Sequence, residues 1–235
     1  MSKFTKYKPF YKKLIALKRN VLNTRKLFRF KKKKWSNFKF HARKALLSRK
    51  RPYKLYDHNR YALHRFMKYY KRRSKHLLTV RNRMKVFYFN LTKKYLTRAC
   101  FSKGKKINKN LNFYYLQILE SRLDVVLYRA RFTSTIRSAQ SLIKNRIVLV
   151  NNNFVTTASF QLNPGDLIQI KRNYWDKIKQ NVLRNYRALL VPYRHLHINY
   201  RVLSISFFGE FKTTDFQLLY PFWLDLNSWV FSYKY

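Results

Sequence analysis

A short segment in the second half of the chain carries the side chains best suited to binding a ligand. Its polar positions recur at helical intervals and are Arg137, Gln140, Ser141 and Lys144. Residues three and four apart are neighbours on a helix surface, so these side chains are expected to share one side of a helix. That side presents two cations next to two uncharged hydrogen-bonding groups.

Two predicted helices position this polar side. Residues 134–145 form the helix that carries it, with Ser134 or Thr135 as the N-cap, because short hydroxyl side chains satisfy the free N–H groups of a first turn. The apolar residues of this helix that are expected to face a core are Ala139, Leu142 and Ile143. The preceding helix covers residues 120–131, and its inward side chains are expected to be Leu123, Val126, Leu127 and Ala130.

A β-hairpin and a closing strand follow these helices. Residues 147–150 and 154–156 are predicted as strands on either side of Asn151-Asn152, because Asn tolerates the positive φ of a type I′ turn. The Pro164-Gly165-Asp166 run predicts a turn before a strand over residues 167–170. The core side chains expected in this part of the chain are Ile147, Leu149 and Ile168.

Amphipathic and alternating patterns predict further elements on both sides. Residues 74–101 carry apolar side chains at three- and four-residue intervals, which predicts one long helix with a basic outer face. A polar linker over residues 102–112 follows it. Beyond the closing strand, residues 173–190 predict a basic helix, and residues 195–206 and 222–235 predict half-buried strands.

The first sixty residues mix lysines with aromatic side chains. The densest basic run is Lys31, Lys32, Lys33 and Lys34, and the aromatic residues around it are Phe28, Phe30, Trp35, Phe38 and Phe40. A freely solvated tail would normally contain few aromatic residues. We therefore expect this segment to become ordered on RNA, with lysines on phosphates and rings stacked on bases or packed locally. A free tail is the alternative.

The formal net charge of +46, from 54 Lys and Arg against 8 Asp and Glu, far exceeds what solubility requires. A net charge of roughly 2–8 suffices for a small domain, so a polyanionic partner is expected to neutralise the excess. Residues 1–119 hold 38 of the basic residues and a single acid, Asp57. This charge favours nucleic acid as the partner, with an anionic membrane surface as the weaker alternative.

The composition gives no support to several other classes of function. Cys100 is the only cysteine, and His195 and His197 have no Cys or carboxylate at metal-ligand spacing, so we expect no metal site. Three glycines leave no loop to cradle the phosphates of a nucleotide, and the acids are too sparse for paired-carboxylate catalysis. No uncharged apolar run approaches the ~18 residues of a membrane span. We therefore expect neither an enzyme nor a bound cofactor.

Four motifs occur in order within about fifty residues. They are Arg122-Leu123-Asp124, then Arg137-x-Ala139-Gln140-x-Leu142-Ile143, then Ile147-x-Leu149-Val150-Asn151, then Pro164-Gly165-Asp166-x-Ile168. This run resembles the small RNA-binding domain named after small-subunit ribosomal protein four, and the flanking segments are similar to the rest of that family. The chain departs from the family where Asn145-Arg146 replaces a usual His-Gly and Asn151-Asn152 replaces a usual Asn-Gly.

The resemblance implies that helix 134–145 lies against ribosomal RNA. Arg137 and Lys144 would contact phosphates, while Gln140 and Asn145 would hydrogen-bond sugars or base edges. Arg122 would also meet RNA, because residues two apart on a helix do not face each other, and Asp124 would order a neighbouring basic residue. The expected RNA-binding residues are Arg122, Ser134, Arg137, Gln140, Lys144, Asn145, Arg146, Lys31, Lys32, Lys33, Lys34, Arg81, Arg83 and Lys85. The alternative for Arg137 is an ion pair with a local carboxylate.

The expected fold class is α+β, with a basic helical N-terminal domain, a small α/β RNA-binding domain and C-terminal strands. The expected boundaries are an extension over residues 1–60, a helical domain over 61–119 completed by 172–235, and the small domain over 120–171. In the small domain, two helices, a β-hairpin and closing strands would form one unit.

The resemblance implies a structural protein of the small ribosomal subunit that binds ribosomal RNA early in assembly and borders the path by which mRNA enters. Its expected partners are small-subunit rRNA, neighbouring ribosomal proteins and mRNA, with no membrane and no second copy of the chain. Low Gly and Ala beside high Lys, Asn, Phe and Tyr favour an organelle-encoded protein, expected in the mitochondrion, with the plastid as alternative. An RNA chaperone or ribosome-rescue factor is the competing function.

Overall fold

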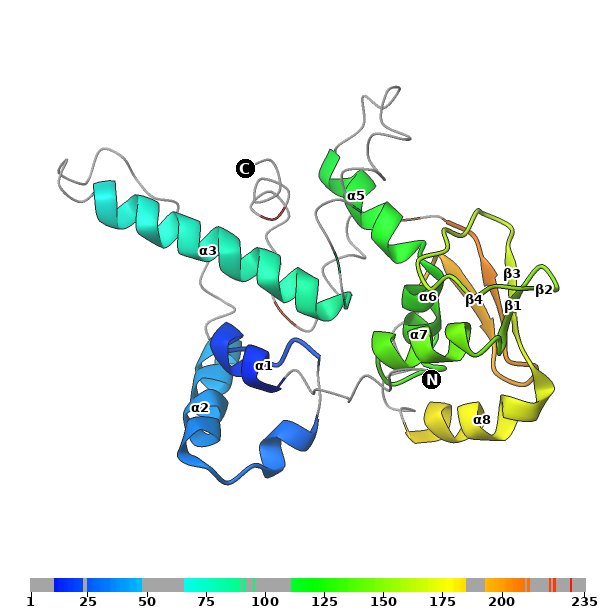
Figure 1. Ribbon diagram of the computed structural model, residues 1–235, viewed down its shortest axis with the longest axis horizontal. Coiled ribbons are helices and arrows are strands. Elements are labelled where there is room, and N and C mark those ends of the chain that lie inside the picture. The colour runs from blue at the N-terminus through cyan, green and yellow to red at the C-terminus, as the bar shows by residue number, and fades with distance from the viewer. Residues whose placement is uncertain are drawn as a thin grey trace, which may run out of the picture. The chain divides into compact units, whose positions relative to one another are not determined.

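The computed structural model describes residues 11–22, 25–47, 66–89, 91, 95, 111–184, 193–209, 211, 220, 222 and 229 (Figure 1). The chain divides into two compact units. The first combines residues 1–90 with 219–235, and the second consists of residues 91–218. Parts of several predicted elements lie outside the described residues, namely 96–101 of the long helix, 102–110 of the linker and 185–190 of the basic helix.

The second unit contains helices and one antiparallel sheet, so the α+β fold class is confirmed (Figure 1). The helical elements are α5 (Leu111–Glu120), α6 (Leu123–Arg129), α7 (Ile136–Lys144), the 3₁₀ turn η6 (Arg172–Tyr174) and α8 (Trp175–Arg184). The strands are β1 (Val148–Val150), β2 (Asn153–Phe154), β3 (Leu167–Ile170), β4 (Leu196–Asn199) and β5 (Ser204–Phe207). They pair in the order β2-β1-β3-β5-β4.

One face of the sheet packs against helices to form the core of this unit. Alternate strand residues point into that core, as the two-residue period of a strand requires. The fully buried strand side chains are Val148, Ile168 and Ile205, and they form one cluster with buried residues of α6, α7 and α8. Burying each such side chain stabilises the fold by about 1.5–3 kcal/mol.

Two core predictions are wrong in this region. Leu149 is only half-buried, because Ile147 and Val148 are both buried and the alternation starts one residue later than the sequence pattern indicated. Leu142 is also half-buried and packs against the edge of the core. The other core predictions in α6 and α7, for Leu123, Val126, Leu127, Ala130, Ala139 and Ile143, are confirmed.

The Asn151-Asn152 turn has the predicted hairpin geometry. Both residues adopt positive φ, at 49° and 66°, which is the requirement of a type I′ turn. Asn151 also ties the turn to the next strand, since its Nδ2 donates to Asp166 Oδ1 at 2.9 Å and its Oδ1 accepts from Leu167 N at 2.9 Å. The amide side chain of Asn151 therefore fixes the turn against the start of β3.

Strands β4 and β5 belong to the small domain, which differs from the expected boundaries. The sequence assigned residues 172–235 to the helical domain, but β5 pairs with β3 in the register Ile168↔Ile205. The strand pairing is non-local, because 37 residues separate these partners in the chain, and local patterns cannot reveal it. Of the predicted strand over 222–235, only residues 222 and 229 are described, and Trp229 is helical.

The first unit is helical over its described residues. Its elements are α1 (Tyr11–Leu17), the 3₁₀ turn η1 (Arg25–Arg29), α2 (Lys33–Leu47) and α3 (Phe66–Phe87). Trp35 and Phe38 are buried and pack edge-on at 5.6 Å between ring centroids. Phe28 and Phe40 remain exposed. Phe30 also packs on Trp35, at 4.8 Å between ring centroids, so these aromatic residues divide into a locally packed group of three and an exposed pair.

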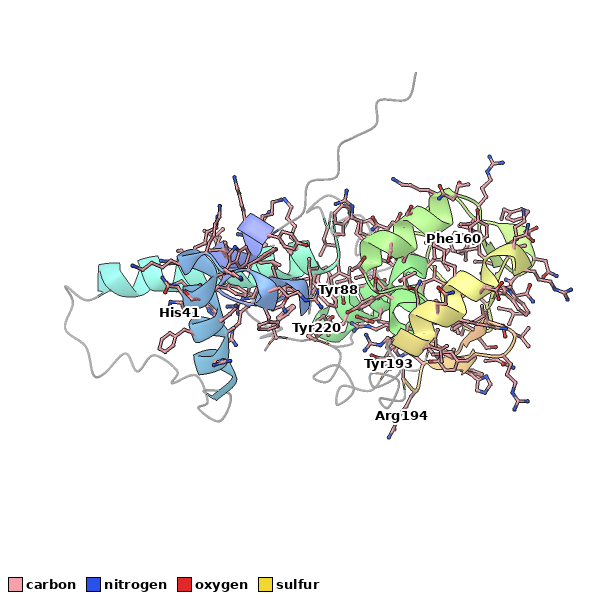
Figure 2. All side chains as sticks on the ribbon, turned by 90° about the horizontal axis from the view of Figure 1, so that it is seen from below. His41, Tyr88, Phe160, Tyr193, Arg194 and Tyr220 are labelled. Atoms are coloured by element: carbon pink, nitrogen blue, oxygen red, sulfur yellow. The ribbon has the colours of Figure 1, made fainter. Side chains whose placement is uncertain are left out.

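The helix predicted over 74–101 is wrong at both ends, since α3 begins at Phe66 and ends at Phe87. Phe89 adopts a φ of 44°, which an α-helix does not accept. Tyr88 is buried and forms a hydroxyl–hydroxyl hydrogen bond with Tyr220, a residue distant in the chain (Figure 2). The division between the two units falls just after this break, between Asn90 and Leu91.

The placement of β5 in the small domain predicts the effect of a core truncation. Ile205→Ala is expected to lower the free energy of unfolding by about 2–5 kcal/mol, because it opens a cavity among side chains that are fully buried. Val202→Ala, at an exposed position in the adjoining turn, is the matched control and is expected to change it by less than about 0.5 kcal/mol. Urea unfolding followed by circular dichroism measures both, and equal effects would contradict the placement.

Candidate nucleic-acid interface

Helix α7 is held at its first turn by a capping box. Thr135 is the N-cap, its Oγ1 accepts from Ser138 N at 3.1 Å, and its own N–H donates to Ser138 Oγ at 3.2 Å. These bonds satisfy N–H groups that a helix start otherwise leaves free, and such a cap stabilises a helix by about 1 kcal/mol. Of the two predicted caps, Thr135 is therefore the one used, and Ser134 is an exposed neighbour.

The predicted polar side of α7 lies outside the core. Ala139 and Ile143 are fully buried, whereas Ser141 and Lys144 are exposed and Arg137 is half-exposed. The helix therefore separates an apolar side from a polar one, as its sequence spacing predicted. The polar side can reach a ligand without disturbing the core.

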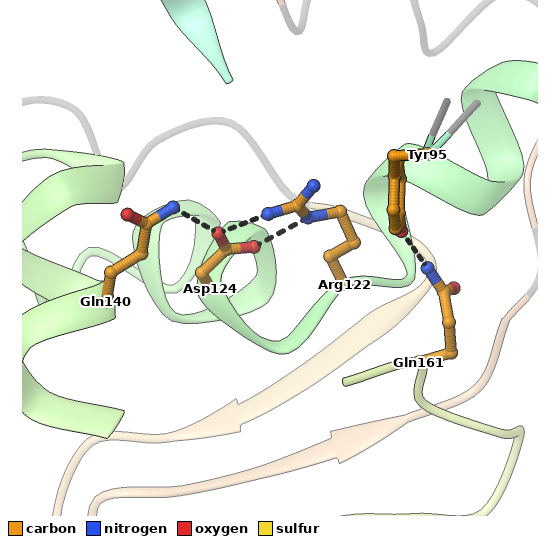
Figure 3. A network of polar contacts seen from close by, with 5 residues as sticks. All are labelled: Tyr95, Arg122, Asp124, Gln140 and Gln161. Atoms are coloured by element: carbon orange, nitrogen blue, oxygen red, sulfur yellow. Dashed lines mark hydrogen bonds and ion pairs between the residues drawn. The ribbon is translucent and has the colours of Figure 1, made fainter. Parts of the chain in front are cut away.

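Gln140 lies on α7 and also makes a hydrogen bond inside the domain. Its Nε2 donates to Asp124 Oδ2 at 2.8 Å (Figure 3). Asp124 lies in the first turn of α6 and is fully buried. The hydrogen bond therefore links α7 to α6 through the amide nitrogen of Gln140, and the contact of this residue with RNA stays a prediction.

Arg122 is paired with Asp124 inside the domain, so the expectation that these two residues do not face each other is wrong, while its contact with RNA stays a prediction. It is 5% exposed, and it donates to both carboxylate oxygens of Asp124, from Nε at 3.0 Å and from Nη2 at 2.7 Å (Figure 3). The prediction assumed that both residues lie on a helix. Arg122 is instead the extended N-cap of α6, with φ −72° and ψ 137°, so its side chain can turn back onto Asp124.

Tyr95 and Gln161 enclose the same arginine. The guanidinium carbon of Arg122 lies 5.1 Å from the centre of the Tyr95 ring, within the range of a cation–π contact. Gln161 Nε2 donates to Tyr95 Oη at 2.6 Å (Figure 3). Gln161 Oε1 accepts from Ser121 Oγ at 2.6 Å. Burial raises the pKa of the Tyr95 hydroxyl above its ordinary value of 10.0, although the Arg122 charge opposes this effect.

A second buried ion pair joins α5 to α6, and the sequence reasoning missed it. Arg129 donates to the two carboxylate oxygens of Glu120 at 2.8 Å each, and both side chains are buried. Such a bidentate pair is among the stronger hydrogen-bonded arrangements in proteins. Nine residues separate the two, a spacing that no helix pattern marks, so only the rarity of acids in this chain could have pointed to Glu120.

Arg146 occupies a strained backbone position at the end of α7. Its φ is 53°, in the left-handed region that favours glycine, and its side chain is exposed, like that of Asn145. A left-handed conformation costs a non-glycine residue roughly 1–2 kcal/mol. The structure thus explains why a glycine is suitable there, and it places a guanidinium at the end of the polar side of α7.

The remaining predicted sites lie in the first unit. Lys31, Lys32, Lys33 and Lys34 are all exposed, with Lys33 opening α2. On α3, Lys85 is exposed while Arg81 and Arg83 are half-buried. Within the described parts of the chain, no three His, Cys, Asp or Glu side chains come close enough to hold a metal ion. No helix among the described residues is long and apolar enough to cross a membrane.

Comparison with known proteins yields one family. Residues 121–168 match the S4 domain. Small ribosomal subunit protein uS4m of Marchantia polymorpha is 32% identical over 148 residues, covering 62% of this chain and 71% of the relative. The same protein of Reclinomonas americana is 29% identical over 174 residues, covering 70% and 67%. Small ribosomal subunit protein uS4c of Gnetum parvifolium is 36% identical over 132 residues, covering 54% and 64%.

The Arg122–Asp124 pair predicts how two variants should differ. Asp124→Ala is expected to lower the free energy of unfolding by about 3–5 kcal/mol, because it leaves a buried guanidinium without its carboxylate. The double variant Arg122→Leu/Asp124→Leu removes both charges and is expected to recover much of that loss. Chemical denaturation measures both, and a double variant as unstable as the single one would contradict the assignment.

Proposed function

Because the chain belongs to the family of small ribosomal subunit protein uS4, in its organellar form, we propose that it is a structural rRNA-binding protein of the small subunit of an organellar ribosome. The relatives are named as ribosomal proteins, and this supports a binding role in place of catalysis. The S4 domain match spans residues 121–168, which include α7, and this supports an RNA contact in that part of the chain.

The outer side of α7 is the single observation that carries this proposal. Arg137 and Lys144 are the cations of that side, and Arg146 extends it beyond the end of the helix. Arginine and lysine bind phosphate oxygens, which supplies affinity and fixes the register of a protein on its RNA. Ser141 and Asn145 are exposed between them and can hydrogen-bond sugars or base edges.

The distribution of acids supports the same conclusion. The described acids of the small domain are Glu120, Asp124, Asp166 and Asp176. Glu120 and Asp124 are buried in ion pairs with arginines, so their charges are not available to neutralise surface cations. Asp166 is held by the hairpin turn through Asn151. Few carboxylates among the described residues of the small domain are therefore left on its surface, which supports an anionic partner for this domain.

The finer parts of the proposal concern place and timing. We place the protein in the mitochondrion, encoded by the organelle, although relatives named for both kinds of organelle are similar to it. It binds folded rRNA early in assembly, and the exposed lysines at residues 31–34 contribute a second RNA contact from the first unit. The basic residues of α3, Arg81, Arg83 and Lys85, face either rRNA or the mRNA that enters the subunit.

An RNA chaperone or ribosome-rescue factor built on the same domain is the competing function. Sedimentation separates the two, because a structural protein stays with the small subunit in sucrose gradients at high salt and a transient factor leaves it. Co-sedimentation of the intact chain with the small subunit is the expected result. Release under conditions that retain the other ribosomal proteins would contradict the structural role.

Charge reversal on α7 is expected to weaken RNA binding without unfolding the domain. Arg137→Glu/Lys144→Glu should lower the affinity for small-subunit rRNA by at least about tenfold, which corresponds to about 1.4 kcal/mol. The matched control is Lys177→Glu/Arg194→Glu, which reverses one Lys and one Arg that are exposed elsewhere on the unit (Figure 2 labels Arg194). Filter binding over a salt series measures both, and equal losses would mean that charge alone, not α7, explains the binding.

Two substitutions of Arg146 distinguish the effect of backbone strain on stability from the effect of the guanidinium on RNA binding. At its positive φ, Arg146→Gly is expected to be more stable than Arg146→Ala by roughly 1 kcal/mol, because glycine adopts this conformation without a Cβ clash. Both variants lose the guanidinium, so both should bind rRNA with the same reduced affinity. Thermal unfolding and filter binding give the two readouts. An unchanged affinity in both variants would remove Arg146 from the interface.

A further inference from the structure

The end of the sheet next to α7 gathers basic residues that the sequence analysis did not assign to any site. They come from the segment after β3 and from the turn between β4 and β5, and they are Lys171, Arg172 and Arg201. All three side chains are exposed. Strand register brings them to one place, although 29 residues separate Arg172 from Arg201.

The pairing pattern defines this end of the sheet. Lys171 N donates to Ile147 O at 3.0 Å, so the end of β3 lies beside the start of β1 and therefore beside Arg146. Strands β3 and β5 are antiparallel with Gln169 opposite Ser204, and Asn199 of β4 is also opposite Ser204. The turn over residues 200–203 thus lies at the same end as Lys171.

The β4–β5 turn holds Arg201 on a well-defined backbone. Asn199 Oδ1 accepts from Arg201 N at 3.0 Å and from Val202 N at 3.3 Å, which is the bonding of an Asx turn. Leu203 then adopts a φ of 51° and is fully buried, so it anchors the turn in the core. A long cationic side chain on an anchored turn loses less conformational freedom on binding than one on a free loop.

An aromatic ring accompanies these cations. Tyr174 lies one 3₁₀ turn after Lys171, and its N–H donates to Lys171 O at 3.0 Å. Lys171 is the N-cap of this 3₁₀ turn, so Tyr174 follows it within one turn of the chain. Tyr174 is 37% exposed, which leaves part of its ring open to a stacking partner.

Acidic residues do not neutralise this end among the residues that the structure describes. Glu120 and Asp124 are buried in ion pairs, and Asp166 lies at the opposite end of β3. Asp176, in the first turn of α8, is the nearest acid along the chain to Arg172. The sheet end therefore carries a net positive charge that continues from the end of α7.

We propose that Lys171, Arg172, Arg201 and Tyr174 form a second RNA-binding surface of the small domain. This surface binds the sugar–phosphate backbone of a single RNA strand, and the Tyr174 ring stacks on one base. Cations that follow a backbone beside an exposed ring are the usual arrangement for binding single strands. The inference rests on the proposed function and extends it, because the strand on this surface would continue from the RNA bound by α7.

The test uses the intact chain and small-subunit rRNA transcribed in vitro, with affinity measured over a salt series. Lys171→Ala/Arg201→Ala is expected to weaken binding about three- to tenfold and to reduce the slope of log affinity against log salt by about 1–2, because about 0.7–0.9 of a counterion is released per phosphate. The matched control, Lys177→Ala/Arg194→Ala, also removes one exposed Lys and one exposed Arg and is expected to leave the slope unchanged.

Two variants of Tyr174 test the proposed stacking contact separately. Tyr174→Phe keeps the ring and is expected to bind like the unaltered chain, whereas Tyr174→Ala is expected to weaken binding several-fold with no change of salt slope. Equal binding by Tyr174→Ala and the unaltered chain would overturn the stacking contact.

Failure of this inference can be told apart from failure of the proposed function. If the sheet-end variant behaves like its control while Arg137→Glu/Lys144→Glu still weakens binding, the second surface is overturned and the role of α7 stands. If the unaltered chain binds small-subunit rRNA no more tightly than an unrelated RNA of equal length, both proposals fall. A sheet-end loss that also appears in thermal unfolding would be a folding defect and would overturn the assignment of these residues to binding.

Discussion

The buried carboxylate of Asp124 is the group on which the position of α7 in the small domain depends. It binds Arg122 through two hydrogen bonds and accepts a third from Gln140, so one side chain connects the start of α6 to the middle of α7. A buried ion pair adds little net stability, but removing one partner is costly. We infer that this arrangement fixes the orientation of α7 more than it stabilises the domain.

Burial of acidic side chains inside the fold changes the balance of charge on the surface of the protein. The chain has only eight acidic residues against 54 basic ones, and two of the acids are enclosed with arginines in the small domain. The exposed cations on α7 and at the sheet end therefore meet few opposing charges on the protein itself. A surface of this kind favours a polyanion at long range and makes its affinity fall steeply with salt.

Local patterns in the sequence were sufficient for the elements that surround α7. The Thr135 cap, the inward residues of α6 and the positive-φ turn at Asn151-Asn152 depend on neighbours within a few residues, so they could be predicted. The fold class and the family also followed from motifs that are contiguous in the chain. These motifs predict a binding surface. In the structure, Arg137 and Lys144 lie outside the core.

Two of the errors share a different cause, which is contact between residues far apart in the chain. The pairing of β5 with β3 joins strands separated by α8, and the end of α3 coincides with the packing of Tyr88 on Tyr220. Arg122 was assigned to RNA because a helical backbone was assumed at a position that is extended. Tertiary contacts decide the first two cases, and a single sequence does not reveal them, whereas the Arg122 error concerns the local backbone.

A cryo-electron microscopy map of the small ribosomal subunit that contains this chain would test the central claim most directly. The account predicts that the side of α7 bearing Arg137 and Lys144 lies against rRNA phosphates, while Arg122 stays inside the domain on Asp124. A map in which that side of α7 faces solvent or another protein, or in which the Arg122 guanidinium contacts a phosphate, would contradict it.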